Sequence, residues 1–158
     1  MGRSRRQKDT KEKLQIFRDS KAKEYSLPYP KKKGDVGFDL TSTEDVVIPP
    51  GIGMPPTEIP TGIRVRLPKG VFAVIFPRSS TYSNFPTLVI CSAPIDNGYI
   101  GPLNPRFRNL GLEPVTIKKG DRIAQLVIFS AVVPKIVEVK SLQETDRGES
   151  RYGSTGRK

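Results

Sequence analysis

Prolines and glycines divide the middle of this chain into short segments, and this division limits the fold more than any other feature. All 15 prolines of the 158-residue sequence lie between Pro28 and Pro134, and glycines punctuate nearly the same stretch. A proline inside a helix removes a hydrogen bond and clashes with the preceding turn. Long helices are therefore excluded there. The segments between these residues are rich in Val, Ile, Thr and Phe, which favour strands.

Alternation of apolar and polar residues supports the same conclusion, as in "GIRVRL" and "VTIKKG". Short strands at close spacing, with turn residues between them, predict an all-β sandwich or barrel. The chain length predicts one domain, which is large enough to enclose a core. Helical patterning occurs only in residues 8–24, where Leu14, Phe17 and, less clearly, Ile16 lie on one side.

Composition excludes several classes of function. The chain has no histidine and one cysteine, Cys91. This excludes His-based triads, the common zinc protease and zinc deaminase sites, and an intrachain disulfide. Proton transfer would have to use Asp, Glu, Lys or Tyr. Neither a membrane-spanning run nor a secretory signal is present, so we expect an intracellular, cytoplasmic protein, with the nucleus or a virus-infected cell left open.

The net charge of +11 is concentrated toward the N-terminus. Residues 1–24 contain nine Lys or Arg residues and four acidic ones, which leaves +5 there. Such a segment is either a solvated tail or a surface for nucleic acid. Nucleic-acid-binding segments usually interleave aromatic residues with the charge, and only Phe17 lies here. We favour the tail and leave nucleic acid open as a partner.

Two stretches could support phosphate chemistry. Asp96 precedes an Asn-Gly pair that favours tight turns, so it could simply start a turn. It could also be the base that orients a water molecule for attack on phosphorus, because phosphoryl transfer needs mainly positioning and charge neutralisation. In "PRSS", Arg78 offers a planar fork of donors, and Ser79 and Ser80 add hydroxyl groups, although such turns are also common without function.

Five short motifs follow one another along the chain. They are "GDVGFDLTS" (34–42), "PRSS" (77–80), "APIDNGYIG" (93–101), "GDRIAQLV" (120–127) and "RGESRYGSTG" (147–156). In this order they resemble the five motifs of the trimeric deoxyuridine triphosphatase (dUTPase) family, over about residues 34–156. The resemblance implies a distorted jelly-roll β-barrel, a homotrimer with active sites at subunit interfaces, and a flexible C-terminal arm.

The resemblance also implies an activity. This is hydrolysis of dUTP to dUMP and pyrophosphate by Mg²⁺-assisted attack of water on the α-phosphate, which limits uracil in DNA and supplies dUMP. Asp96 would activate the water, and Tyr99 would pack against the deoxyribose and exclude a 2′-hydroxyl. Main-chain groups of a hairpin over residues 88–99 would read uracil. Asp39 would assist Mg²⁺ indirectly, through water.

Phosphate binding is implied for two further regions. Arg78, Ser79, Ser80 and Gln125 would hold phosphate oxygens. The C-terminal segment would close over the nucleotide as a mobile flap. Its expected contacts are Arg147, Tyr152 (stacked on uracil), Gly153, Ser154 and Thr155. We therefore divide the chain into a basic N-terminal extension that is partly helical or disordered (1–24), a β domain (25–143) and a flexible flap (144–158).

Some residues depart from the dUTPase pattern. Ser150, Arg151 and Tyr152 replace Gly, Gly and Phe, which should make the flap stiffer and more basic. "IDNGYIG" also resembles the dCTP deaminases, a sister family whose catalytic glutamate is replaced here by Arg106. Because an arginine stays protonated, it cannot relay protons for deamination. A dCTP deaminase or bifunctional enzyme is the alternative function, and a non-catalytic nucleotide-sensing or nucleic-acid-binding protein is a further one.

Overall fold

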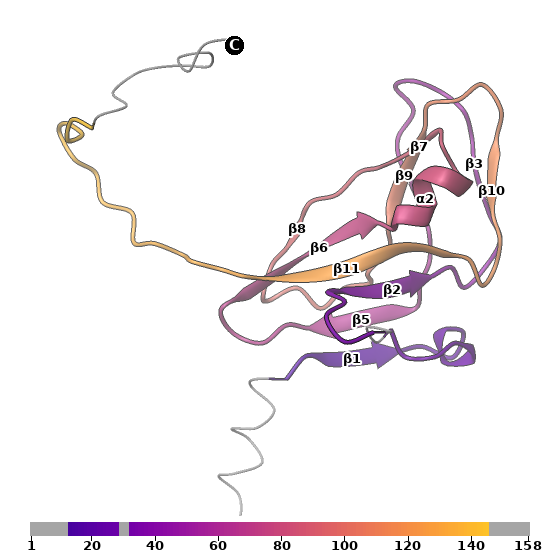
Figure 1. The fold of residues 1–158 in the computed structure, drawn as a ribbon, viewed down its shortest axis with the longest axis horizontal. Helices are drawn as coiled ribbons and strands as arrows, with labels where there is room; N and C mark the ends of the chain where they lie inside the picture. The colour runs from indigo at the N-terminus through magenta and orange to yellow at the C-terminus, as the bar shows by residue number, and fades with distance from the viewer. Residues whose placement is uncertain (1–12, 29–31, 146–158) are drawn as a thin grey trace, which may run out of the picture.

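The computed structural model describes residues 13–28 and 32–145, and strands dominate these residues (Figure 1). In chain order the elements are β1 (Gln15–Arg18), η1 (Ala22–Glu24), β2 (Gly37–Thr41), β3 (Val46–Ile48), β4 (Thr57–Glu58), β5 (Ile63–Arg66), β6 (Val71–Pro77), α2 (Ser79–Asn84), β7 (Leu88–Ile90), β8 (Pro94–Ile95), β9 (Arg106–Asn109), β10 (Val115–Ile117) and β11 (Arg122–Ser130). The predicted all-β class is confirmed. No helix within the described ranges is long and apolar enough to cross a membrane.

The strands form small sheets around one core. The largest sheet has the order β2-β11-β6-β8, and a second has the order β4-β9-β7. Two-stranded pairs, β10-β3 and β1-β5, complete the set. In β5 the predicted alternation is present, since Ile63 and Val65 are buried while Arg64 and Arg66 are exposed. The largest fully buried apolar side chains are Leu40, Ile48, Ile59, Leu103, Phe107, Ile117 and Ile123.

Residues 15–18 form a strand, so the helical pattern expected over residues 8–24 is wrong there, although residues 22–24 form the short 3-10 helix η1. Strand β1 pairs antiparallel with β5 along its whole length. Leu14 and Ile16 pack against the core, while the Phe17 side chain is 59% exposed. The period of two along the strand turns Leu14 and Ile16 toward the core, where they are half-buried. The edge of β5 provides hydrogen-bond partners for the backbone of this segment. Tertiary pairing thus overrides a weak helical pattern.

The turn after β1 anchors this segment to the β domain. The Asp19 backbone N–H donates to the carbonyl oxygen of Gly62 at 3.0 Å, and Ala22 N–H donates to Asp19 Oδ1 at 2.8 Å. Gly62 has a φ of +64°, and a Cβ atom there would lie 2.3 Å from Asp19 Oδ1. Ala22 is buried. The predicted N-terminal extension therefore includes residues that belong to the β structure.

Deleting residues 1–24 should destabilise the protein more than deleting residues 1–12. The longer deletion removes Leu14, Ile16 and Ala22 from the core and leaves the β5 edge unpaired. We expect a loss of about 3 kcal/mol in the free energy of unfolding, typical of losing large apolar groups from a core. The thermal midpoints of both variants and the parent, at equal concentration, measure this. Equal midpoints for the two deletions would show that β1 contributes nothing to stability.

A short helix, α2, lies outside the region where helical patterning was predicted. It begins after Arg78, whose N–H donates to Thr81 Oγ1 at 3.2 Å. Thr81 is buried, and its hydroxyl donates to the carbonyl oxygen of Ile123 in β11 at 2.9 Å. Pro86 follows shortly after the helix and cannot continue it. A single side chain that reaches a distant strand thus places this helix, and local sequence periodicity does not reveal it.

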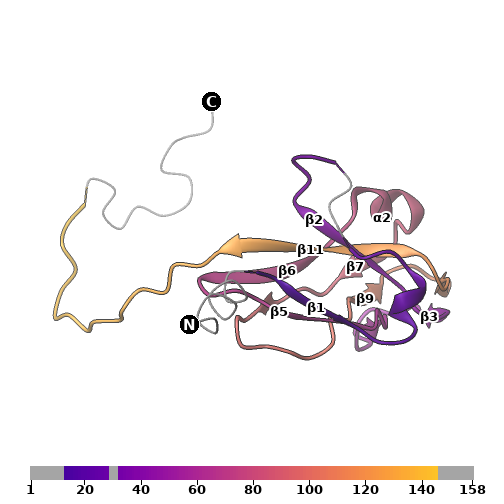
Figure 2. The same cartoon turned by 90° about the horizontal axis from the view of Figure 1, so that it is seen from below.

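Beyond β11 the chain leaves the body as an extended arm, and the two views agree on this (Figures 1 and 2). The described part of the arm, residues 131–145, contains no helix or strand. Val132, Val133, Ile136 and Leu142 are each 88–93% exposed. The flap residues predicted to contact the nucleotide lie outside the described residues. They are Arg147, Tyr152, Gly153, Ser154 and Thr155.

Candidate functional site

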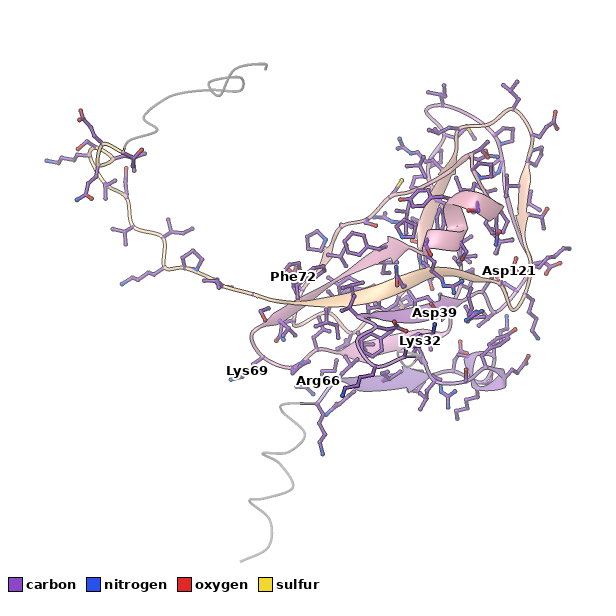
Figure 3. All side chains as sticks on the ribbon, in the orientation of Figure 1. Lys32, Asp39, Arg66, Lys69, Phe72 and Asp121 are labelled. Carbon is purple, nitrogen blue, oxygen red and sulfur yellow. The ribbon has the colours of Figure 1, made fainter. Side chains whose placement is uncertain are left out.

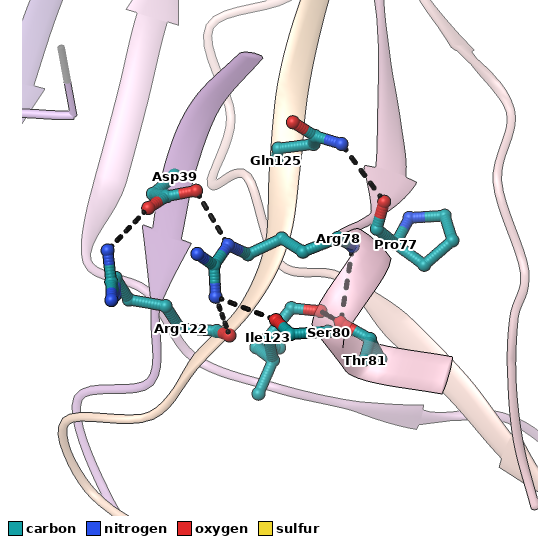
Figure 4. Close-up of polar contacts among 8 residues, drawn as sticks. All are labelled: Asp39, Pro77, Arg78, Ser80, Thr81, Arg122, Ile123 and Gln125. Carbon is teal, nitrogen blue, oxygen red and sulfur yellow. Dashed lines mark hydrogen bonds and ion pairs between the residues drawn. The ribbon is translucent and has the colours of Figure 1, made fainter. Parts of the chain in front are cut away.

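Three charged side chains meet beside β2 and β11 (Figure 4). Asp39 in β2 accepts a hydrogen bond from Arg78 Nε at 2.7 Å with Oδ1, and from Arg122 Nη1 at 3.0 Å with Oδ2. The antiparallel pairing of β11 with both β2 and β6 brings these three residues together. The Asp39 side chain is only 22% exposed. Arg122 was not predicted as a site residue, although it lies inside the "GDRIAQLV" motif.

Further hydrogen bonds fix the orientation of the Arg78 guanidinium. Its Nη1 donates to the carbonyl oxygen of Arg122 at 3.0 Å and to Ser80 Oγ at 3.2 Å. Two arginines and one aspartate leave this cluster with a net positive charge. An arginine fork held in place in this way is suited to binding phosphate oxygens. The structure therefore brings the predicted residues Asp39, Arg78 and Ser80 together.

A pocket of about 450 Å³ lies next to this cluster, and Asp39, Arg78, Ser79 and Gln125 line it with the loop over residues 34–37. Gln125 Nε2 donates to the carbonyl oxygen of Pro77 at 3.1 Å. A Cβ atom on Gly37 would lie 1.9 Å from Gln125 Oε1, so a larger residue at this position would displace the Gln125 amide. Gly37 of the motif "GDVGFDLTS" thus leaves space for the side chain of Gln125 in the motif "GDRIAQLV". We refer to this hollow as the cationic pocket.

Asp96 and Tyr99 line a different pocket, of about 340 Å³, together with residues 90–95 and 102–106. Tyr99 Oη donates to the carbonyl oxygen of Pro102 at 3.1 Å, and the residue is 43% exposed. Within the described part of the chain, the Asp96 carboxylate has no hydrogen-bond or ion-pair partner. An uncommitted carboxylate that lines a pocket can accept a proton from water. We refer to this hollow as the Asp96 pocket.

The backbone around Asp96 forms the expected turn but not the expected hairpin. Tyr99 N–H donates to the Asp96 carbonyl oxygen at 3.0 Å, with Asn97 and Gly98 between them. Neither central residue has the positive φ of the favoured hairpin turn. The hairpin predicted over residues 88–99 is wrong, because β7 pairs with β9 while β8 pairs with β6. The connecting residues cross from one sheet to another.

The two pockets are well separated within one chain. Asp96 follows β8 directly, and the register of β8 with β6 places it beside Phe72, near the start of β6. Asp39 lies in β2, at the level of Phe76 near the end of β6. Strand β2 is three strands away from β8 in the sheet. Figure 3 labels Phe72 and Asp39 and shows this offset. Strand geometry gives about 13 Å along the strands and about 14 Å across them, or roughly 20 Å in total. Asp96 therefore cannot reach a water molecule beside a phosphate that its own chain's Arg78 binds.

Side chains that could bind a metal ion directly are not clustered within the described ranges. No group of three or more Asp, Glu, Cys or His side chains within the described ranges could hold one. Both oxygens of Asp39 already accept hydrogen bonds from arginines. Mg²⁺ keeps several waters and takes many of its direct ligands from substrate phosphates. The residues around Asp39 are therefore compatible with Mg²⁺ that a phosphorylated ligand carries, rather than with Mg²⁺ held by protein side chains alone.

Altered pKa values occur away from both pockets. The hydrogen bond between Lys118 and Asp45 raises the pKa of the lysine and lowers the pKa of the carboxyl group. A hydrogen bond to Glu44 likewise raises the pKa of Lys21. These side chains are about half to two-thirds exposed, and such surface pairs contribute little to stability. They link neighbouring turns and take no part in either pocket.

Comparisons with known proteins agree with the motifs. The family model "dUTPase" matches residues 23–156. The chain is 42% identical over 146 residues to the deoxyuridine 5'-triphosphate nucleotidohydrolase of Caldanaerobacter subterraneus subsp. tengcongensis, covering 90% of this chain and 97% of that protein.

Solved structures show the same fold. A mutant dUTPase of Staphylococcus bacteriophage 80alpha with dUpNHpp superposes with a TM-score of 0.80 at 29% identity, covering 92% of this chain and 99% of the other. A mutant dUTPase of S. aureus phage phi11, described with a structural Mg(II) ion, gives 0.70 at 27% identity over 82% and 97% of the two chains. The predicted jelly-roll β fold is thereby confirmed, and the chain belongs to the dUTPase family.

Proposed function

We propose that this protein hydrolyses dUTP to dUMP and pyrophosphate. The observation that carries the proposal is the division of the motif residues between two complementary pockets. One contains the uncommitted carboxylate of Asp96 together with Tyr99, and the other contains the fixed guanidinium of Arg78. The reaction needs a general base next to the bound sugar, and it needs a site that binds the phosphates. The relative from Caldanaerobacter carries the name of this activity.

The proposed chemistry is a single displacement at phosphorus. Asp96 orients a water molecule and takes its proton as the oxygen attacks the α-phosphorus. The bond from the α-phosphorus to the bridging oxygen breaks, and pyrophosphate leaves. Arg78, Ser79, Ser80 and Gln125 hold phosphate oxygens and stabilise the developing charge. Mg²⁺ bound with the nucleotide would supply additional neutralisation of the phosphates, with Asp39 assisting through water. The phage phi11 dUTPase is described with a structural Mg(II) ion.

We further propose that the active protein is a homotrimer with its sites at subunit interfaces. The separation of roughly 20 Å between the two pockets of one chain supports this, since strand spacing sets that distance. The arm over residues 131–145 supports it too, because its apolar side chains are almost fully exposed. Such a surface gains stability when a neighbouring subunit covers it. The flap, residues 144–158, would then close over a site on another subunit.

Product analysis tests the proposed activity. Purified protein incubated with dUTP and Mg²⁺ should release dUMP and pyrophosphate in equal amounts, and dCTP should not be deaminated. Formation of dUTP or dUMP from dCTP would favour the deaminase alternative, which Arg106 argues against. Nucleotide binding without turnover would favour a sensing role. The expected intracellular location, where nucleotides are available, belongs to the same proposal.

Selection of the sugar gives a second test. If Tyr99 packs against the deoxyribose, the 2′-hydroxyl of UTP meets the ring, and kcat/KM for UTP should be at least about 100-fold below that for dUTP. This corresponds to roughly 3 kcal/mol, as expected for an unsatisfied or clashing hydroxyl group. Tyr99→Ala should reduce the difference between kcat/KM for dUTP and kcat/KM for UTP. Similar kcat/KM values for UTP and dUTP in the parent would remove Tyr99 from the site.

A further inference from the structure

Arg106 brings an unexpected cation to the Asp96 pocket. It begins β9, at the position that the resemblance to dCTP deaminases gives to a glutamate, and its side chain is exposed. Among the described residues that line this pocket it is the only lysine or arginine. Asp96, Tyr99 and Glu58 line the same pocket. A residue with a positive charge therefore lines the space in which Tyr99 would hold the sugar of the substrate.

The guanidinium of Arg106 is not committed to the fold. Cross-strand pairing places Glu58 of β4 opposite Arg106, yet the two side chains form no ion pair. Glu58 instead accepts a hydrogen bond from Asn104 Nδ2 at 3.4 Å. No side-chain hydrogen bond of Arg106 is present within the described ranges. Its backbone, by contrast, is fixed, because Cys91 N–H donates to the Arg106 carbonyl oxygen at 2.7 Å.

The chemistry of this group can separate two bases. A guanidinium has five N–H donors and no acceptor. The 4-position of uracil carries an acceptor oxygen, as thymine does, whereas the 4-position of cytosine carries a donor amino group. A donor placed at that position therefore favours uracil and leaves cytosine with two donors facing each other. Glu58 and Asp96 line the same pocket, and their carboxylates make it electrostatically favourable for a cation.

We infer that Arg106 donates a hydrogen bond to the 4-carbonyl oxygen of the uracil ring and so contributes to the rejection of cytosine. The inference rests on the proposed function, because it takes Tyr99 as the platform for the deoxyribose. A base attached to that sugar lies among the other residues of the pocket. Arg106 then acts as a specificity-determining residue in addition to the main-chain groups expected to read the base.

Substitution at Arg106, with Arg108 as the matched control, tests the inference. Arg108 lies two residues further along β9, is also exposed, and does not line the pocket. Arg106→Met should lower kcat/KM for dUTP by about 10- to 100-fold, the loss expected for one hydrogen bond from a charged donor. The change should appear mainly in KM. The ratio of kcat/KM values for dUTP and dCTP should fall by a similar factor, and Arg106→Lys should retain part of it.

Binding of dUMP and dCMP, measured by calorimetry, gives the same comparison without turnover. Arg106→Met should weaken dUMP binding without weakening dCMP binding, while Arg108→Met should match the parent for both. An equal loss for the uracil and cytosine nucleotides would overturn the inference, since it would point to a phosphate contact or a damaged fold. Unchanged discrimination would overturn it as well. Absence of dUTP hydrolysis by the parent would contradict the proposed function instead, and the binding comparison would still test Arg106.

Discussion

Asp96→Asn should lower kcat for dUTP by about 10²- to 10⁴-fold, the range that one general base contributes. The amide keeps the shape of the side chain but is a poor acceptor for a proton from water. The Asp96 carboxylate has no partner within the described part of the chain, so its replacement removes no structural contact. Affinity for dUTP, measured by calorimetry, should therefore stay within a few-fold of that of the parent.

Asp45→Asn is the matched control for this substitution. Asp45 is an exposed aspartate outside both pockets, and its ion pair with Lys118 lies at the surface. The control should keep full kcat. If Asp96→Asn retained activity within about tenfold of the parent, Asp96 could not be the base, because the lower bound for general base catalysis is larger. Unaltered thermal midpoints in both variants would show that the fold is intact.

Truncation after Gln143 should lower kcat by about 100-fold or more, roughly 3 kcal/mol in the barrier, which removal of one charged clamp on a transition state can cost. Arg147 and Tyr152 are lost, whereas β11 and the core remain. The flap should act mainly on the transition state, so affinity for dUTP should fall much less than kcat. The trimer should persist, because the exposed apolar residues of the arm precede the cut. Steady-state kinetics, calorimetry and sedimentation measure these quantities.

Mixing the truncated protein with Asp96→Asn shows which subunits share a site. If the flap and Asp96 of one site come from different chains, some mixed trimers contain a complete site and regain activity after subunit exchange. If both come from one chain, no mixed trimer can be complete. Persistent inactivity after exchange has been demonstrated, for example by labelled subunits, would contradict the proposed interface site.

Local sequence patterns predicted the features of the fold that depend only on neighbouring residues in the chain. The alternation in "GIRVRL" is reproduced in β5, because neighbouring side chains of a strand point to opposite faces wherever the strand lies. The same kind of evidence failed for residues 15–18. Leu14, Ile16 and Phe17 fit a weak helical stripe, but the open edge of β5 selected a strand. Helix α2 depends on the contact between Thr81 and Ile123, which are 42 residues apart.

The order of the five motifs along the chain predicted the family and the types of residue at the site. It could not show how they are arranged, because contacts between residues far apart in sequence leave no local periodicity. The bond from Arg122 to Asp39 spans 83 residues, and Arg122 was missed for that reason. The division into a cationic pocket and an Asp96 pocket, like the free guanidinium of Arg106, follows from which strands pair and in which register. Which strands pair is determined by tertiary structure, because it depends on burial of the whole core and not on the sequence of any one segment.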